Sequence, residues 1–223
     1  MHNIRLPHLS ACMVFFDFDN TITLFDLLDD IIERFSVGTE WIKLENAWRT
    51  GKISSRECLE GQLRSIRVTK KDLLQYISQI RIDPHFYRLF AMLKREGMKP
   101  VILSDSFTFI IEAILKNNGI KDVKVYANTL KFHKGRLIPS FPYRNKRCLR
   151  CANCKKKSLQ RKDVRNKIII YIGDGLSDIC PAEYADIVFA KRELLNHFRK
   201  TKRLCLAYNS LGDITNYFRG LEK

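Results

Sequence analysis

The sequence predicts an α/β protein in which a parallel sheet is flanked by helices. Three short apolar runs, at 13–16, 100–103 and 167–172, have the length and composition of buried strands and are separated by helical patterns. Each run leads directly into polar residues, in the sequences DFD, SDS and GDGLSD. Four helical patterns follow the first run without an intervening strand, which predicts a small helical insertion after that strand.

Two aspartates, Asp17 and Asp19, stand where the first strand should end. Successive strand residues point to opposite faces, so these two carboxylates share one side, and open α/β sheets bind ligands at the carboxyl ends of their strands. Two like charges this close need a cation or a shared proton. The alternative is that both aspartates only cap the turn into the following helix.

Four motifs occur along the chain, and they carry a family resemblance. In order they are DxDxT with Asp17, Asp19 and Thr21; ILSDS with Ser104; a downstream lysine; and GDGLSD with Asp174 and Asp178. Together they resemble the haloacid dehalogenase superfamily, and the chain looks like one of its phosphatases. It is most similar to the subgroup with phosphoserine phosphatase, the phosphocholine and phosphoethanolamine phosphatases, and the methionine-salvage phosphatases that act on a ketopentenyl phosphate. The resemblance covers about 13–188 and implies a Rossmannoid core with a C1-type helical cap.

The resemblance implies a role for each acid. Asp17 is expected to attack phosphorus and form an aspartyl-phosphate, and Asp19 to act first as general acid and then as general base. The expected cofactor is Mg²⁺, which suits an oxygen-rich site. Its expected ligands are Asp17, the backbone carbonyl of Asp19 and Asp174, with Asp178 placing its waters or the lysine.

The same resemblance assigns phosphate binding to Ser104, a lysine and Thr21. Lys155, Lys156 and Lys157 all follow the cysteine-rich stretch and compete for the role of that lysine. Counting back from GDGLSD and matching the Cys-Lys step of the relatives favours Lys155, with Lys157 in reserve. A lysine is needed because the phosphoryl group and the attacking carboxylate are both anionic.

The helical insertion is expected to be a cap over the active site, with a core at 1–24 and 83–223 and the cap at 25–82. Ser54 and Thr69 are the expected N-caps of its last two helices. Closing such a cap excludes water and commits the substrate, so its contents should carry specificity. Its four helices are expected at about 25–35, 39–49, 55–66 and 69–80.

Three cap residues are candidates for reading the substrate. Asp26 lies nine residues after Asp17, where phosphoserine phosphatases place a glutamate that reads the substrate ammonium. Arg64 or Arg67 could act as their carboxylate-binding arginine. The alternative is that Asp26 only starts a helix and both arginines are solvated.

The second motif departs from the pattern of the phosphoserine phosphatases. Those enzymes usually have two glycines after its serine, whereas this chain has Asp105 and Ser106. This difference leaves the phosphate site in place but puts an amino-acid substrate in doubt. The remaining elements are expected as helices at 86–96, 107–117, 193–199 and 214–221, strands at 123–127, 187–190 and 204–207, and a hairpin over 130–138.

Cys148, Cys151 and Cys154 form a CxxCxxC cluster in the insert that follows the hairpin. This spacing is good geometry for Zn²⁺, and a fourth ligand could come from His133 or another residue nearby. The alternative is that these are reduced structural thiols, because closed zinc sites usually show two separated pairs of ligands.

The chain is strongly basic, with a net charge of +16 over 223 residues. The stretch 144–167 alone has eleven Lys or Arg and one acid. Such a balance attracts anions, including nucleic acid, but no RNP-like, helix-turn-helix or aromatic stacking pattern accompanies it. A solvated basic surface, or a field that draws in phosphate esters, is therefore favoured over nucleic-acid binding.

The expected function is a Mg²⁺-dependent phosphomonoesterase acting on a small phosphorylated metabolite of the salvage ketopentenyl phosphate or phosphocholine type. The alternatives are a phosphoserine phosphatase, a phosphotransferase that passes the phosphoryl group to an alcohol, and a basic nucleic-acid binder on a degenerate enzyme fold. No apolar run approaches the roughly 20 residues of a membrane span, and the N-terminal run is too short for a secretory signal, so a cytoplasmic location is expected. Spacing alone decides neither the substrate nor the oligomeric state.

Overall fold

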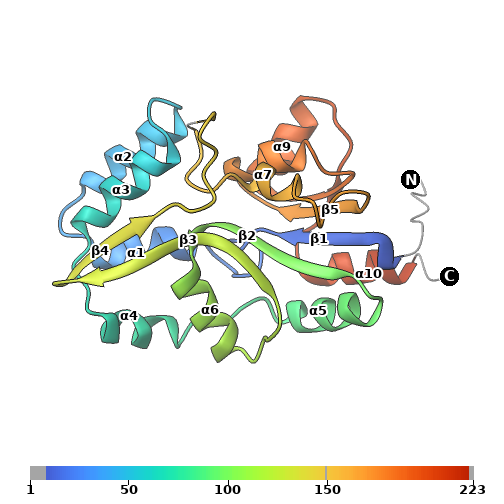
Figure 1. Cartoon of the computed structure of the whole chain (residues 1–223), viewed down its shortest axis with the longest axis horizontal. Coiled ribbons are helices and arrows are strands. Elements are labelled where there is room, and N and C mark those ends of the chain that lie inside the picture. Colours follow the sequence, from blue (N-terminus) through green and yellow to red (C-terminus); the bar gives the residue numbers. More distant parts are fainter. Residues whose placement is uncertain (1–8, 149, 221–223) are drawn as a thin grey trace.

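A central sheet organises the computed structural model, which describes residues 9–148 and 150–220 (Figure 1). The seven strands found in these residues have the order β4-β3-β2-β1-β5-β6-β7. All neighbouring pairs are parallel except β3 and β4. The strands are β1 (Cys12–Phe16), β2 (Lys99–Phe107), β3 (Lys124–His133), β4 (Arg136–Ser140), β5 (Ile168–Gly173), β6 (Ile187–Ala190) and β7 (Leu206–Ala207). The expected α/β class is therefore confirmed.

Helices cover both faces of this sheet. In Figure 1, α5, α6 and α10 lie below the sheet, and α7 and α9 lie above it. No helix in the described part of the chain is long and apolar enough to cross a membrane. The helices are α1 (Leu27–Phe35), α2 (Glu40–Arg49), α3 (Ser55–Ser65), α4 (Lys70–Ile77), α5 (His85–Arg95), α6 (Thr108–Asn117), α7 (Lys155–Leu159), α8 (Ile179–Ala182), α9 (Arg192–Lys200) and α10 (Leu211–Gly220), with short 3-10 turns η1 (Leu9–Ala11) and η2 (Leu176–Asp178).

Strand β1 is the centre of the core, because it pairs with both β2 and β5. All five of its residues are buried. Val14 and Phe16 pack into the apolar cluster on one face of the sheet, and Met13 and Phe15 pack into the cluster on the other. This alternation follows from the two-residue period of a strand, and burial on both faces explains the continuous apolar run in the sequence.

The four helices predicted between the first two core strands are present, with shifted ends. Asp26 is the N-cap of α1, which therefore begins at Leu27. Ser54 forms a reciprocal capping box with Glu57 at the start of α3, and Thr69 caps α4. An isolated antiparallel bridge between Thr23 and Ile82 joins the two ends of this insertion. The division of the chain into a core and a cap at 25–82 stays a prediction.

The region predicted as a strand at 123–127 and a separate hairpin is one long strand, β3, paired with β4 around a turn at Lys134 and Gly135. Asn128 lies between the two predicted segments, is fully buried, and donates from its amide to the carbonyl of Asp105. The polar residue therefore satisfies the backbone where β2 and β3 change register, between Leu103 and Phe107.

Asn153 fastens the irregular segment before α7 to this same region. Its side-chain nitrogen donates to the carbonyls of Ser104, at 2.7 Å, and Tyr126, at 2.8 Å. Its backbone N–H donates to the carboxylate of Asp105 at 3.1 Å. One buried asparagine thus joins β2, β3 and the segment that leads into α7.

We expect Asn153→Ala to lower the free energy of unfolding by about 2 kcal/mol, because two buried carbonyls lose their donors. Thermal and denaturant unfolding should both report this loss. The matched control is Asn216→Ala at an exposed position of α10, which should change stability by less than about 0.5 kcal/mol. Equal stability of the two variants would contradict this account of Asn153.

Candidate active site

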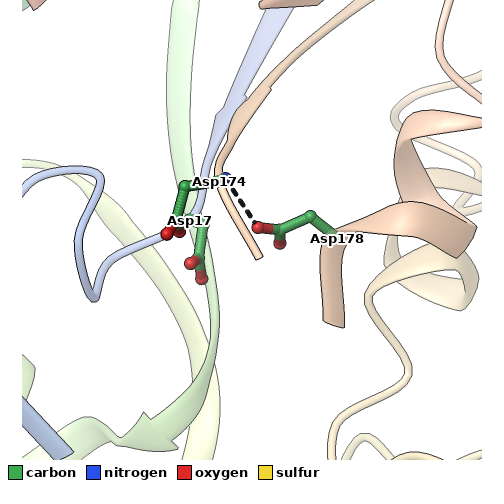
Figure 2. Close-up of side chains that lie close together, drawn as sticks. All are labelled: Asp17, Asp174 and Asp178. Carbon is green, nitrogen blue, oxygen red and sulfur yellow. Dashed lines mark hydrogen bonds between the residues drawn. The ribbon is translucent and has the colours of Figure 1, made fainter. Parts of the chain in front are cut away.

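Three aspartates meet where β1 and β5 end (Figure 2). Asp17 follows β1, Asp174 follows β5, and Asp178 comes from η2 and faces the other two. One oxygen from each carboxylate lies within 4.8 Å of the others, and all three residues are buried. Among the described residues, this is the group of three or more His, Cys, Asp or Glu side chains close enough to share a metal ion.

The GDGLSD turn holds Asp178 in place through the backbone. One of its carboxylate oxygens accepts from the backbone N–H groups of Asp174 and Gly175, both at 3.0 Å. Gly173 is needed because a Cβ there would lie 2.6 Å from the same carboxylate. The GDGLSD motif therefore holds the buried carboxylate of Asp178 at the end of β5. A larger residue at position 173 would displace this carboxylate.

Lys155 is the cation at the centre of this acidic cluster. Its ammonium lies 2.6 Å from Asp17 Oδ1 and 2.7 Å from Asp178 Oδ1, and it donates to Ser177 Oγ at 3.1 Å. Its side chain is only 2% exposed, whereas Lys157 is exposed. Of the two lysines weighed from the sequence, Lys155 is the one that reaches the aspartates.

The charges of the cluster are strongly perturbed by burial. Desolvation on its own would lower the pKa of Lys155, but the carboxylates of Asp17 and Asp178 raise it well above its ordinary value. Burial and the charge of Asp178 raise the pKa of Asp17 far above its usual range and that of Asp174 to about 7. Arg192 also lies 3.6 Å from Asp174 but is largely exposed, so three buried acids face one buried cation. This balance favours a further cation, and an all-carboxylate donor set suits a hard ion such as Mg²⁺.

Asp19 is placed differently from the other acids. Its carboxylate accepts from the backbone N–H groups of Leu27, at 3.2 Å, and Leu28, at 3.3 Å, at the start of α1. Its side chain is not part of the close aspartate group, and the metal contact of its backbone carbonyl stays a prediction. Burial and the nearby charge of Asp26 raise the pKa of Asp19 well above its ordinary value, which favours a protonated carboxyl.

The residues predicted to bind phosphate occupy two different positions. Ser104 is buried, lines the pocket beside the aspartates and accepts from the N–H of Ser106 at 2.9 Å. Ser106 also lines the pocket, and its buried hydroxyl has no hydrogen-bond partner in the described part of the chain. Thr21 instead directs its hydroxyl to Asp174, at 3.5 Å, and does not line the pocket.

A pocket of about 270 Å³ opens beside the cluster. Its far side is formed by side chains of the helical insertion, three of which are acidic. Burial raises the pKa of Asp29 to about 7 and also raises that of Glu45. The lining residues from the insertion are Asp26, Leu28, Asp29, Glu45, Trp48, Arg49, Ser55, Cys58, Leu59 and Gln62.

The candidate substrate-reading residues divide between the pocket and the surface. Asp26 lines the pocket and also caps α1 by accepting from the N–H of Asp29, so both interpretations of this residue apply. Arg64 and Arg67 are exposed and do not line the pocket. The guanidinium of Arg67 donates to the carbonyls of Arg64 and Ile66.

Sequence reasoning missed several residues that touch the site. The hydroxyl of Tyr171 donates to Asp178 Oδ1 at 2.7 Å, and a tyrosine inside the run IIIYI was the one signal that could have indicated it. Arg192 lies 3.6 Å from the carboxylate of Asp174, and Arg49 of α2 forms an ion pair with Glu193 of α9. These arginines have no local motif, because the chain is rich in basic residues throughout.

Comparison with known proteins agrees with this fold. A family model described as "Putative Phosphatase" matches residues 12–206. The 2-hydroxy-3-keto-5-methylthiopentenyl-1-phosphate phosphatase of Brevibacillus brevis is 28% identical over 216 residues, 95% of each chain. The phosphoserine phosphatase of Archaeoglobus fulgidus is 24% identical over 82% of this chain and 54% of its own. A solved substrate-bound phosphoserine phosphatase complex has a TM-score of 0.72 at 20% identity, over 92% of this chain and 97% of that one.

The fold is therefore that of the haloacid dehalogenase phosphatases, as the motifs predicted. The family match spans most of the chain, so the protein belongs to the "Putative Phosphatase" family and is a phosphatase of that superfamily.

We expect Asp174→Asn to stabilise the metal-free protein at about pH 8 but to have little effect near pH 4. The folded pKa of Asp174 is about 7, against 3.8 ordinarily. Between these pH values Asp174 keeps its proton in the folded state and loses it in the unfolded chain. The free energy of unfolding therefore falls as the pH rises, and this decrease is complete above about pH 7.

Calorimetry in a chelator should show Asp174→Asn melting a few degrees above the native protein at the higher pH. Asp213→Asn is the control, because backbone N–H groups of Ser210 and Asn209 lower the pKa of Asp213 and its neutralisation should bring no gain. A melting temperature at or below that of the native protein would contradict the proposed repulsion at Asp174.

Proposed function

We propose that this phosphatase is a Mg²⁺-dependent phosphomonoesterase that hydrolyses a small phosphorylated metabolite through an aspartyl-phosphate on Asp17. The observation that carries this proposal is the contact of Lys155 with Asp17 and Asp178 beside Asp174. Of these residues, Asp17 and Asp174 line the pocket. An anionic nucleophile that approaches an anionic phosphate needs positive charge beside it. The buried ammonium of Lys155 supplies one such charge, and the acids can bind a metal ion that supplies more.

Asp17, Asp174 and the backbone carbonyl of Asp19 would hold the Mg²⁺, and Asp178 would position its waters. The ion would screen the negative charge of the phosphate and of the attacking carboxylate. Lys155 provides the same kind of screening from the protein side. Its bond to Oδ1 of Asp17 orients this carboxylate and leaves the second oxygen for attack.

The two chemical steps follow from the positions of Asp17 and Asp19. An oxygen of Asp17 forms a bond to phosphorus while the ester P–O bond breaks, and protonated Asp19 gives its proton to the leaving alkoxide. Asp19 then takes a proton from a water molecule that attacks phosphorus, which releases inorganic phosphate and restores Asp17. The raised pKa of Asp19 supports its first role, because the acid must be protonated when the ester binds.

Ser104 and the residues that directly follow it are proposed to bind the phosphate oxygens. Ser104 and Ser106 both line the pocket, and the buried hydroxyl of Ser106 has no hydrogen-bond partner among the described residues. We assign phosphate contact to Ser104 and Lys155. Thr21 is assigned a supporting role, because its hydroxyl is directed to Asp174.

The helices at 25–82 are proposed as the cap that covers this pocket. Residues of α1, α2 and α3 form its far wall, and the ion pair between Arg49 and Glu193 links α2 to α9 at the pocket. Opening of the cap would break this exposed pair, which costs little. Such a contact can therefore close the site and still release the product.

The far wall favours a substrate whose leaving group is cationic. Asp26, Asp29 and Glu45 lie there with the aromatic ring of Trp48, a combination that suits an ammonium or a quaternary amine. Arg49 and Arg192 also line the pocket and offer a partner to a substrate carboxylate, so this wall does not argue against phosphoserine. The acids and Trp48 support a phosphocholine-like or phosphoethanolamine-like ester as the first candidate. The second candidate is a ketopentenyl phosphate, favoured by the similarity to the Brevibacillus enzyme over 95% of both chains.

The remaining alternatives are less well supported. A phosphotransferase would use the same aspartyl-phosphate but pass it to an alcohol, so added alcohol would lower the yield of inorganic phosphate. A nucleic-acid binder would use the basic segment, where Arg161 lies 4.5 Å from the ring of Tyr126 but is also paired with Asp163. The acidic pocket does not suit a nucleic-acid strand.

The test of the proposed function is release of inorganic phosphate from a panel of phosphomonoesters, with and without Mg²⁺. Asp17→Asn should abolish turnover, and Lys155→Met should lower kcat by at least about 100-fold because the phosphoryl charge loses its cation. Lys157→Met, at an exposed position of the same helix, is the control and should stay within about twofold of the native protein. Full activity of Asp17→Asn would refute the mechanism.

We expect Glu45→Gln to raise KM for choline and ethanolamine phosphates by about tenfold, which corresponds to roughly 1.4 kcal/mol. The new amide oxygen can still accept from Gln62 and Cys58, so the fold should be kept. Neutral esters should be unaffected. The control is Glu40→Gln on the same helix, whose side chain is 72% exposed. An equal effect on neutral and cationic esters would refute the charge preference.

A further inference from the structure

A buried serine links the helical insertion to the segment that leads into Lys155. Ser55 is the first residue of α3, is 6% exposed and lines the pocket. Its backbone N–H, which has no partner within the helix, donates to the carbonyl of Arg150 at 3.0 Å. Its hydroxyl accepts from the N–H of Ala152 at 2.7 Å. Two hydrogen bonds therefore join the start of α3 to residues 150–153, which we call the strap.

The strap is held on its other side by the core. The N–H of Asn153 donates to the carboxylate of Asp105 at 3.1 Å, and the Asn153 side chain donates to carbonyls of β2 and β3. Burial raises the pKa of Asp105, and the positive charge of Lys155 opposes this shift. The strap therefore lies between α3 and β2, close to the active-site lysine.

The cysteines considered as a zinc site belong to the same part of the chain. Cys148, Cys151 and Cys154 are free thiols. Among the described residues, the three active-site aspartates have ligand atoms within 4.8 Å of one another, but these three thiols do not form such a group. The structure therefore does not bring the thiols together as a closed zinc site, and hydrogen bonds account for the position of the strap.

We propose that Ser55 is a positioning residue through which the helical insertion holds Lys155 in place, an inference that rests on the proposed function. Only Asn153 and Cys154 separate Ala152 from Lys155, and both are buried. A close-packed interior transmits a displacement instead of absorbing it, so a shift of Ala152 reaches the lysine. The hydrogen bond between Ser55 and Ala152 thus limits the movement of Lys155.

The contacts of Lys155 are sensitive to such a movement. Its ammonium lies 2.6 Å from Asp17 and 2.7 Å from Asp178. A small displacement lengthens both hydrogen bonds, and a misplaced charge stabilises the transition state less. Loss of the Ser55 contact should therefore slow the chemical step more than it weakens substrate binding.

Ser55 and Arg49 link the insertion to the core in different ways. Ser55 is buried and bonds to backbone groups, whereas the side chains of Arg49 and Glu193 are 46% and 36% exposed. Leaving a buried N–H without its acceptor costs more than opening an exposed ion pair. When the pair of Arg49 and Glu193 opens, the Ser55 end of α3 stays attached, and Lys155 keeps its place while the product leaves.

The first test is amide hydrogen exchange of the full chain, resolved to Ala152 by NMR. Ser55→Ala removes the acceptor of this N–H, so its exchange should become at least about tenfold faster than in the native protein. Ser54→Ala is the matched control, because Ser54 caps the same helix by bonding to Glu57 instead of the strap. In this control the exchange of Ala152 should stay within about twofold of the native rate.

The second test is phosphate release by the same variants. Ser55→Ala should lower kcat by about tenfold and change KM by less than about twofold, whereas Ser54→Ala should leave both nearly unchanged. In a Lys155→Met background, Ser55→Ala should lower kcat no further, because both substitutions act through the same ammonium. Circular dichroism checks folding. Where Ser55→Ala does not fold, Ser55→Cys replaces it, because a thiol of similar size is a weaker acceptor.

Exchange at Ala152 that is as slow in Ser55→Ala as in Ser54→Ala would overturn the proposal. So would a native kcat in Ser55→Ala, or an equal loss of kcat with and without Lys155, because Ser55 would then act independently of the lysine. A native protein that hydrolyses no ester would count against the proposed function, whereas faster exchange at Ala152 in Ser55→Ala would still show that Ser55 holds the strap.

Discussion

The buried ion pairs of Lys155 with Asp17 and Asp178 connect the parts of the chain that build the site. The ammonium of Lys155, at the start of α7, donates to a carboxylate at the end of β1 and to another in the turn after β5. Charges removed from water are costly unless they are paired and hydrogen-bonded, so each group depends on the others being in place. Tyr171 and the backbone N–H groups of the GDGLSD turn complete the bonding of Asp178.

Polar residues at the irregular edge of the sheet keep this arrangement rigid. Where β2 and β3 change register, backbone groups lose their ladder partners, and Asn128 and Asn153 replace them with side-chain hydrogen bonds. Asn153 also fixes the segment that carries Lys155. The position of the Lys155 ammonium matters because a charge in a water-excluded site stabilises the transition state only when it lies close to the charge that develops there.

The surface and the pocket have opposite electrostatic character. The chain carries a net charge of +16, which attracts anionic esters over a distance, whereas acids of the helical insertion line the pocket. In the proposed function, Lys155 and a metal would neutralise the aspartates where phosphate binds, and the far wall would discriminate among the leaving groups. The net charge acts at long range and the pocket acids act at short range, so a basic protein could still prefer a substrate with a cationic end.

The sequence by itself determined the α/β class, the order of the motifs, the helix caps and the identity of the acids, because apolar periodicity, capping patterns and the DxD and GDGLSD signatures are local. It also pointed to Lys155 ahead of Lys157. Only the tertiary structure decided the continuity of β3, the roles of Asn153 and Tyr171, and the surface position of Arg64 and Arg67. Each of these depends on contacts between residues far apart in the chain, and such contacts leave no periodic signal in the sequence.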